Sequence, residues 1–125
     1  MSLAMPENAK PWPTEIRLSK DKRTLTIAYD NGDAPAFAAE FLRVHSPSAE
    51  VQGHSPEQRQ TVPRKRNVAI TAIDPIGNYA VRITFDDGHN TGLFSWDYFR
   101  TLAANHDALW ATYLSDLAQK GLGRE

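Results

Sequence analysis

Polar and apolar residues alternate along two runs in the first third of the chain. Leu25, Ile27 and Tyr29 fall on one face of the second run, and a charged turn separates it from the first. Two alternating runs across a short polar turn predict a β-hairpin. This part of the pattern predicts strands over residues 14–19 and 24–29, a short strand near residues 36–37 and a short helix over residues 38–43.

The second half alternates again and then changes to helical periodicity. Tyr79, Val81, Ile83 and Phe85 share one face of an extended run, and the Asp-Gly pair that follows is a hairpin signature. The pattern predicts strands over residues 68–73, 79–85 and 91–94, a helix over 96–102 capped by Ser95, and a last helix over 108–120. The apolar stripe of that last helix consists of Leu109, Trp110, Tyr113, Leu114 and Leu117.

These elements predict an α+β fold, with a small antiparallel sheet of hairpins, a short helix after the first hairpin and a helical C-terminus. The expected organisation is a flexible leader over 1–12, a domain over 13–104 and a C-terminal helix over 105–125 packed on it. Trp12 is expected to anchor the leader, and residues 1–4, before Met5, are interpreted as a cloning remnant. The strand at 14–18 is expected at a sheet edge that could pair with a second copy, so the oligomeric state stays open.

Residues 44–66 break the periodic pattern. They are rich in Ser, Pro, His and Gln, and they end in the basic run Arg64-Lys65-Arg66. A long irregular segment in a small domain is uncommon and is usually functional or mobile. We therefore expect a loop here, and we expect it to carry the function.

Composition narrows the possible functions. The 125 residues contain no cysteine, which excludes disulfides, thiolate metal sites and cysteine nucleophiles and fits a reducing compartment, so we expect the cytoplasm. The net charge is −1, so bulk electrostatics favour neither nucleic acid nor an anionic membrane as a partner. No run approaches the roughly 20 apolar residues of a membrane-spanning helix.

Three histidines are candidate metal ligands. His45 and His54 lie in the irregular segment and His89 lies in a predicted turn; if the segment folds back, they could share one divalent ion, with Glu50 or Asp87 as a further ligand. The alternative is three surface histidines without a metal. Because the ligand spacing is not tight, the second interpretation is favoured and no cofactor is expected.

Other charged residues have structural and functional interpretations. Adjacent carboxylates at Asp86 and Asp87 fit a turn better than a catalytic pair, because neighbours on a strand point to opposite faces. The run Arg64-Lys65-Arg66 is interpreted as a solvated loop. Arg43 either anchors the irregular segment, by bonding carbonyls or Glu50, or binds an anionic group of a partner; the anchoring role is favoured.

Two stretches carry a family resemblance: residues 40–54, EFLRVHSPSAEVQGH, and residues 77–96, GNYAVRITFDDGHNTGLFSW. They resemble the domain of unknown function that forms the N-terminal domain of γ-butyrobetaine hydroxylase, and the likeness covers about residues 12–103, as in short stand-alone bacterial members. The resemblance implies a structural zinc held by three cysteines and one histidine. The matching positions here are Ser46, Ser48, Val51 and His89. Serine does not replace thiolate and valine cannot ligate, so neither the zinc nor the oxygenase activity of the separate iron domain is expected.

Three functions follow as expectations. The first is a non-catalytic accessory or interaction module with an unknown protein partner, since related domains are appended to P-loop ATPases of iron–sulfur cluster assembly. The second is a metal-binding protein, and the third is a small enzyme with a histidine base, although no active-site signature is legible. In place of the metal, packing around Phe41, Leu42 and Val51 is expected to hold the loop. The candidate binding residues are Arg43, His45, Ser46, Ser48, Glu50, His54, Asp87 and His89.

Overall fold

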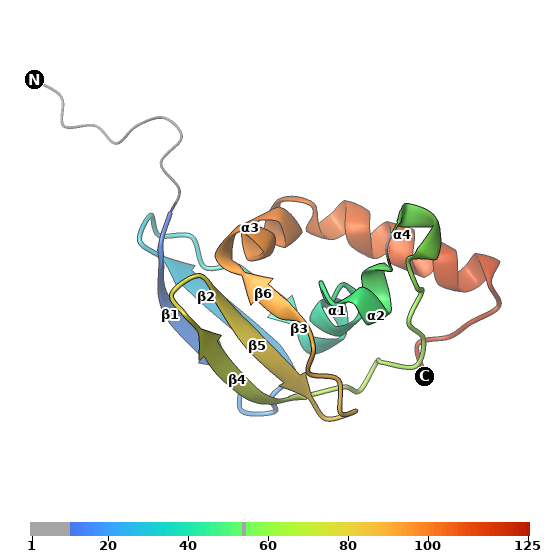
Figure 1. Cartoon of the computed structure of the whole chain (residues 1–125), viewed down its shortest axis with the longest axis horizontal. Coiled ribbons are helices and arrows are strands. Elements are labelled where there is room, and N and C mark those ends of the chain that lie inside the picture. Colours follow the sequence, from blue (N-terminus) through green and yellow to red (C-terminus); the bar gives the residue numbers. More distant parts are fainter. Residues whose placement is uncertain (1–10, 54) are drawn as a thin grey trace, which may run out of the picture.

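The computed structural model describes residues 11–53 and 55–125, so the expectations for residues 1–10 and for His54 lie outside it. One sheet contains β1 (Pro13–Leu18), β2 (Thr24–Tyr29) and β3 (Ala36–Ala38); the other contains β4 (Ile70–Ile76), β5 (Ala80–Phe85) and β6 (Leu93–Ser95). The helices are α1 (Ala39–Val44), α2 (Ala49–Gln52), the 3-10 turn η1 (Pro56–Gln58), α3 (Trp96–Ala104) and α4 (His106–Gln119). The α+β prediction is confirmed, with the strands divided between two antiparallel sheets and the helices gathered at one end (Figure 1).

The core lies where the two sheets and the helices meet. Leu25 and Ile27 of β2 are fully buried, as is Ile83 of β5, which confirms the face predicted from alternation. Tyr79 was expected on the same face, but 55% of its surface is exposed. The reason is that β5 begins one residue later, so Tyr79 belongs to the turn, where Gly77 adopts a φ of +53°.

Each sheet has an edge strand that is poorly shaped for pairing with a further strand. The edge strands β1 and β4 each contain a proline and a register shift. The shift lies between Pro13 and Glu15 in β1, and between Ile70 and Ala72 in β4. The prediction that β4 stops before residue 74 was wrong, because Pro75 pairs with Val81 and an edge strand tolerates a residue without an N–H group. Prolines and bulges are features that protect an edge from pairing with another chain.

The segment over residues 44–66 is more regular than expected. It contains α2 and η1, and the backbone N–H of Gln60 donates to the carbonyl of Val51 at 2.7 Å. Its basic end pairs with the C-terminal segment, since the N–H of Arg64 donates to Gly123 O at 2.9 Å and that of Arg66 to Arg124 O at 3.0 Å. These contacts between distant parts of the sequence explain why a local pattern did not reveal the order.

The C-terminal helices close the core. Ser95 caps α3 as predicted, accepting a hydrogen bond from the Tyr98 N–H at 3.0 Å. Tyr113 and Leu117 of α4 pack against Val44 of α1, whereas Leu114, expected on the same stripe, is 39% exposed. Over the residues that the structure describes, no helix has the length and apolar character needed to cross a membrane.

The entry into β1 is fixed by its backbone rather than by the expected Trp12 anchor. The N–H of Trp12 donates to Asp30 Oδ1 at 3.1 Å, and the N–H of Asp30 donates to Trp12 O at 2.9 Å. Trp12 as a whole residue remains 53% exposed. The position of the chain is therefore set without burying the ring.

A buried ion pair ties the C-terminal segment to α1. Glu40 is only 6% exposed, and Arg124 donates to both of its carboxylate oxygens, at 2.8 and 2.7 Å. The guanidinium also lies over the Trp110 ring, 5.3 Å from its centroid. A bidentate pair of this kind satisfies a carboxylate that would otherwise be buried alone.

We predict that Arg124→Ala lowers the free energy of unfolding by about 2–3 kcal/mol, because it leaves Glu40 buried without its partner. Arg66→Ala is the matched control, since its pair with Glu125 has both side chains at least half exposed, and it should cost less than about 0.5 kcal/mol. Urea denaturation of the two variants measures this. Equal losses would show that the buried pair contributes no more than an exposed one.

Candidate functional site

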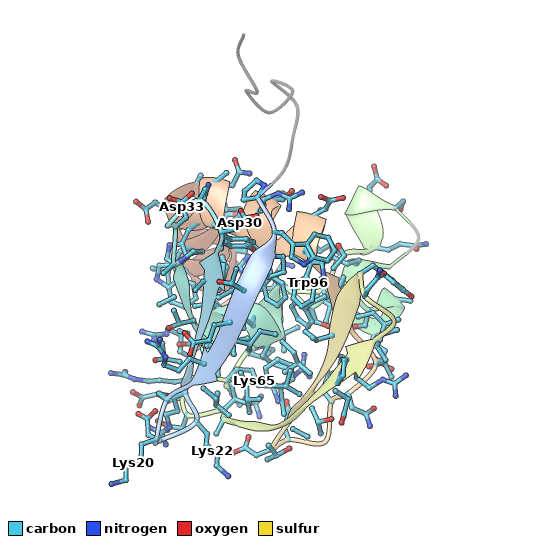
Figure 2. The ribbon with its side chains drawn as sticks, turned by 90° about the vertical axis from the view of Figure 1, so that its left-hand side faces the viewer. Lys20, Lys22, Asp30, Asp33, Lys65 and Trp96 are labelled. Carbon is cyan, nitrogen blue, oxygen red and sulfur yellow. The ribbon has the colours of Figure 1, made fainter. Side chains whose placement is uncertain are left out.

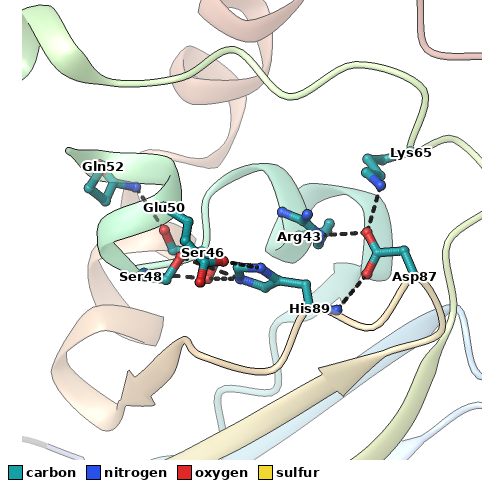
Figure 3. A network of polar contacts seen from close by, with 8 residues as sticks. All are labelled: Arg43, Ser46, Ser48, Glu50, Gln52, Lys65, Asp87 and His89. Carbon is teal, nitrogen blue, oxygen red and sulfur yellow. Dashed lines mark hydrogen bonds and ion pairs between the residues drawn. The ribbon is translucent and has the colours of Figure 1, made fainter.

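A largely buried polar cluster joins the α1–α2 segment to the turn between β5 and β6. Ser46 and Ser48 come from the first, Asp87 and His89 from the second, and Glu50 lies in the first turn of α2 (Figure 3). The two parts lie more than forty residues apart in the sequence and meet here. With Arg43, which pairs with Asp87, the structure therefore brings together six of the eight residues predicted as a binding surface.

Both ring nitrogens of His89 are engaged. Nε2 lies 2.9 Å from Ser46 Oγ and 3.3 Å from Ser48 Oγ, while Nδ1 lies 3.1 Å from Glu50 Oε2. A carboxylate can only accept, so Nδ1 carries the proton and Nε2 accepts from the serine hydroxyls. The backbone N–H of Ser48 donates to Ser46 Oγ at 3.4 Å, which continues the chain of hydrogen bonds.

Asp87 anchors the same turn on its other side. Its Oδ1 accepts the N–H of His89 at 3.0 Å, the turn role that was predicted. Its Oδ2 lies 2.8 Å from Arg43 Nε and 2.6 Å from Lys65 Nζ. Arg43 is thus an anchor, as favoured, but Asp87 rather than Glu50 is its partner. Lys65 was missed: its run looked solvated, and only the fold reveals that its side chain is 21% exposed and paired.

Charge and burial shift two pKa values in this cluster. Burial would raise the pKa of Asp87, but hydrogen bonds from Lys65, from the backbone of His89 and from Arg43 lower it to about 2. Burial, followed by the positive charge of Arg43, lowers the pKa of His89, although Glu50 and Asp87 act the other way. His89 is therefore neutral at pH 7, as its hydrogen bonds require.

The cluster is closed to solvent at its centre. Ser46 is fully buried and Ser48 and His89 are at most 8% exposed. A methyl group added at Gly92 would lie 2.3 Å from Ser46 Oγ. The backbone at Gly92, directly before β6, therefore packs on that hydroxyl. Serine, histidine and carboxylate stand in the order of a hydrolytic triad. However, this serine has neither exposure nor space for a substrate.

His45 lies elsewhere, so in the described part of the chain it does not join His89 in the shared metal site that was the less favoured interpretation. Its Nδ1 is 2.9 Å from the carbonyl oxygen of Phe41, and its ring centroid lies 4.5 Å from that of Phe41 and 6.3 Å from that of Tyr113. His54 lies outside the described residues. Among residues 11–53 and 55–125, no three His, Asp or Glu side chains are grouped to hold a metal ion.

Comparison with known proteins identifies the family to which the chain belongs. The model of the γ-butyrobetaine hydroxylase-like N-terminal domain matches residues 16–100. The chain belongs to this family. The match confirms the resemblance read from residues 40–54 and 77–96, and no curated protein matches the chain.

Solved structures of similar proteins carry the same fold. One protein with an NMR solution structure shares 47% identity with the chain, over 94% of the chain and 92% of its own length, with a TM-score of 0.79. A second protein with an NMR solution structure shares 45% identity, over 98% of the chain and 91% of its own length, with a TM-score of 0.80. A crystal structure of a DUF971-family protein of unknown function from Acidithiobacillus ferrooxidans shares 37% identity over 74% of the chain and 92% of its own length, with a TM-score of 0.62. These similarities support the fold and leave the function open.

The residues present do not fit the zinc implied by the resemblance to the γ-butyrobetaine hydroxylase-like domain. The fold does bring Ser46, Ser48 and His89 together, but the only nitrogen of His89 that could ligate already accepts a serine hydroxyl. Val51 is 2% exposed in the core and has no donor atom. Zinc in structural sites is held by thiolates and imidazoles, so this donor set is one ligand of four.

We predict that stability falls as pH drops from about 7 to 5. The unfolded imidazole takes up a proton near pH 6.5 and folded His89 only at lower pH, so the unfolded state binds more protons in this window. Each such histidine contributes a slope of at most about 1.4 kcal/mol per pH unit. Urea denaturation across this range should show that the free energy of unfolding changes less steeply with pH in His89→Gln. His45→Gln should reduce this pH dependence by a further, independent amount, because burial lowers the pKa of His45 too. An unchanged slope in His89→Gln would contradict the account.

We also predict that three thiols convert the cluster into a metal site. The variant S46C/S48C/V51C, with His89 retained, should bind Zn²⁺ at least about a thousandfold more tightly than the natural sequence. The matched control is S46C/S48C, which supplies two thiolates only. Competition with a chromogenic chelator gives both affinities, and no gain of the triple over the double variant would show that the four positions do not converge.

Proposed function

We propose that this chain is a non-catalytic accessory module of the cytoplasm that acts by binding another protein. The observation that carries the proposal is that Ser46 and His89 are buried and paired with each other, whereas large aromatic side chains are exposed at the surface. Ser46 and His89 satisfy each other in a buried cluster. Trp12 and Tyr79, by contrast, are 53% and 55% exposed.

The exposed Trp12 and Tyr79 meet the half-buried Trp96 at one surface hollow. Trp12, Tyr79 and Trp96 line a cavity of about 370 Å³, and Figure 2 shows Trp96 between β1 and the strands of the second sheet. The indole N–H of Trp96 donates to Asn78 O at 2.9 Å, which fixes the ring. Large exposed aromatic side chains are typical of partner-binding surfaces. We assign binding to this aromatic hollow in place of the surface expected over residues 45–66, because Ser46 and Ser48 of that segment and the adjoining His89 are buried.

The chemistry of the aromatic hollow favours an extended proline-rich segment of the partner. Its cation, Arg100, is already held by Asp97 and lies 3.5 Å from Pro11 O. The Trp96 donor is also in use, so ring faces are what the surface offers. Aromatic-lined grooves bind proline-rich chains because these are extended before binding and lose little entropy.

Neither alternative function has a comparable observation behind it. A metal-binding role would need the histidines to meet, and His45 lies with Phe41 and Tyr113 instead. A hydrolytic role would use the Ser46–His89–Glu50 arrangement, whose nucleophile is fully buried. A fully buried serine under a close backbone favours a structural role for the cluster.

We predict that decaproline binds the aromatic hollow and that a Gly/Ser decapeptide does not. In an NMR titration, decaproline should shift the amide signals of residues 12, 78–79 and 95–97, and W12A/Y79A should weaken binding by at least about tenfold. Leu114→Ala is the matched control, because Leu114 is an exposed apolar residue on α4.

Affinity capture from cell extract with the same variants extends the test to natural partners. The expected result is a protein retained by the natural sequence and by Leu114→Ala, and lost from W12A/Y79A. If neither decaproline nor any captured protein depends on Trp12 and Tyr79, the proposed function is wrong.

A further inference from the structure

His45 lies between two adjoining hollows that the function proposed above does not use. The first, of about 280 Å³, extends along α4 toward Lys120. The second, of about 300 Å³, extends toward α3 and Tyr98. Both are lined by the same four residues, Val44, His45, Arg59 and Leu109. Cavities of this size are at the lower end of those that bind small molecules.

The ring of His45 is held in one orientation with one nitrogen unused. Nδ1 lies 2.9 Å from the carbonyl oxygen of Phe41, which can only accept, so Nδ1 is the protonated nitrogen. The Tyr98 hydroxyl donates to the backbone carbonyl of His45 and fixes the residue further. Burial lowers the pKa of His45, which keeps the ring neutral at pH 7. Nε2 is then a hydrogen-bond acceptor without a partner among the described residues.

Arg59 supplies a positive charge beside this acceptor. Within the described residues its guanidinium makes no hydrogen bond or ion pair, and its charge acts on both His45 and Tyr98. In the first hollow this charge is balanced, because Glu57 and Asp116 also line it. The second hollow has no carboxylate among its lining residues, so there the guanidinium is free to bind an anion.

The remaining wall of the second hollow is largely apolar. Val44, Leu102 and Leu109 line it from α1, α3 and α4, with Pro47 beside them. A ligand that matches all three features has a carboxylate for Arg59, a hydrogen-bond donor for Nε2 of His45 and a short branched hydrocarbon body for the apolar wall. A free carboxylate alone would face the lone pair of Nε2, which is why the donor is needed.

We propose that the second hollow binds a small hydroxycarboxylic acid, with its carboxylate on Arg59 and its hydroxyl donating to His45. The inference stands independently of the proposed protein partner, since the aromatic hollow shares no lining residue with this site. Three related compounds separate the contributions: 2-hydroxyisovalerate has every feature, isovalerate lacks the hydroxyl, and 2-hydroxyisovaleramide lacks the charge.

The test is an NMR titration of the full chain with each compound. We expect 2-hydroxyisovalerate to give saturable shifts at residues 44–47, 59 and 102–109, and to bind at least about tenfold more tightly than either relative. Arg59→Ala should weaken it by a similar factor, whereas Arg64→Ala, an exposed arginine outside the hollow, should not. His45→Phe keeps an aromatic ring on Phe41 and should abolish the preference for the hydroxylated compound.

Two results would overturn the proposal. One is the absence of saturable shifts up to about 10 mM, since a ligand of this size with a charge-assisted contact should bind by then. The other is binding that Arg59→Ala and His45→Phe leave unchanged. The spectrum of each variant without ligand shows whether it is folded, so a loss of binding can be assigned to the missing group.

Discussion

The hydrogen bond between Ser46 and His89 is the interaction on which the rest of the site depends. It joins the segment that follows α1 to the turn between β5 and β6 across 2.9 Å, in a place from which water is excluded. Left unpaired, either group would carry the cost of a buried polar atom, about 1–3 kcal/mol. Pairing them fixes the turn between β5 and β6. This turn places Asp87 beside Arg43 and Lys65.

This arrangement explains how the chain can hold this loop without the zinc that the sequence resemblance implies. A structural metal supplies folding free energy through its ligands. Here the contributions are distributed among the serine hydroxyls on His89, the two cations on Asp87 and the burial of Val51. The same closure leaves the cluster without room for a substrate, which is why the exposed aromatic hollow and the His45 hollow, rather than the cluster itself, are the surfaces assigned to binding.

Much of the fold was predictable because it is local. Alternation located the buried faces of β2 and β5, and Ser95 marked the start of α3. The errors arose where contacts between distant parts of the sequence determine the structure. β4 continues through Pro75 because it is an edge strand, and residues 44–66 are ordered by the C-terminal segment. In the site, the residue types around His89 were foreseen, but the pairing of Lys65 and the separation of His45 depend on the three-dimensional arrangement.

The most direct measurement of the central claim is the protonation state of the His89 ring, from long-range ¹H–¹⁵N correlation spectra at pH 7 with and without a chelator. The account predicts a neutral ring protonated at Nδ1, with Nε2 shifted by the hydrogen bond from Ser46 and with no change on adding the chelator. A ring protonated at Nε2, a charged ring, or a spectrum that the chelator alters would contradict the claim that hydrogen bonds among the chain's own residues hold this site.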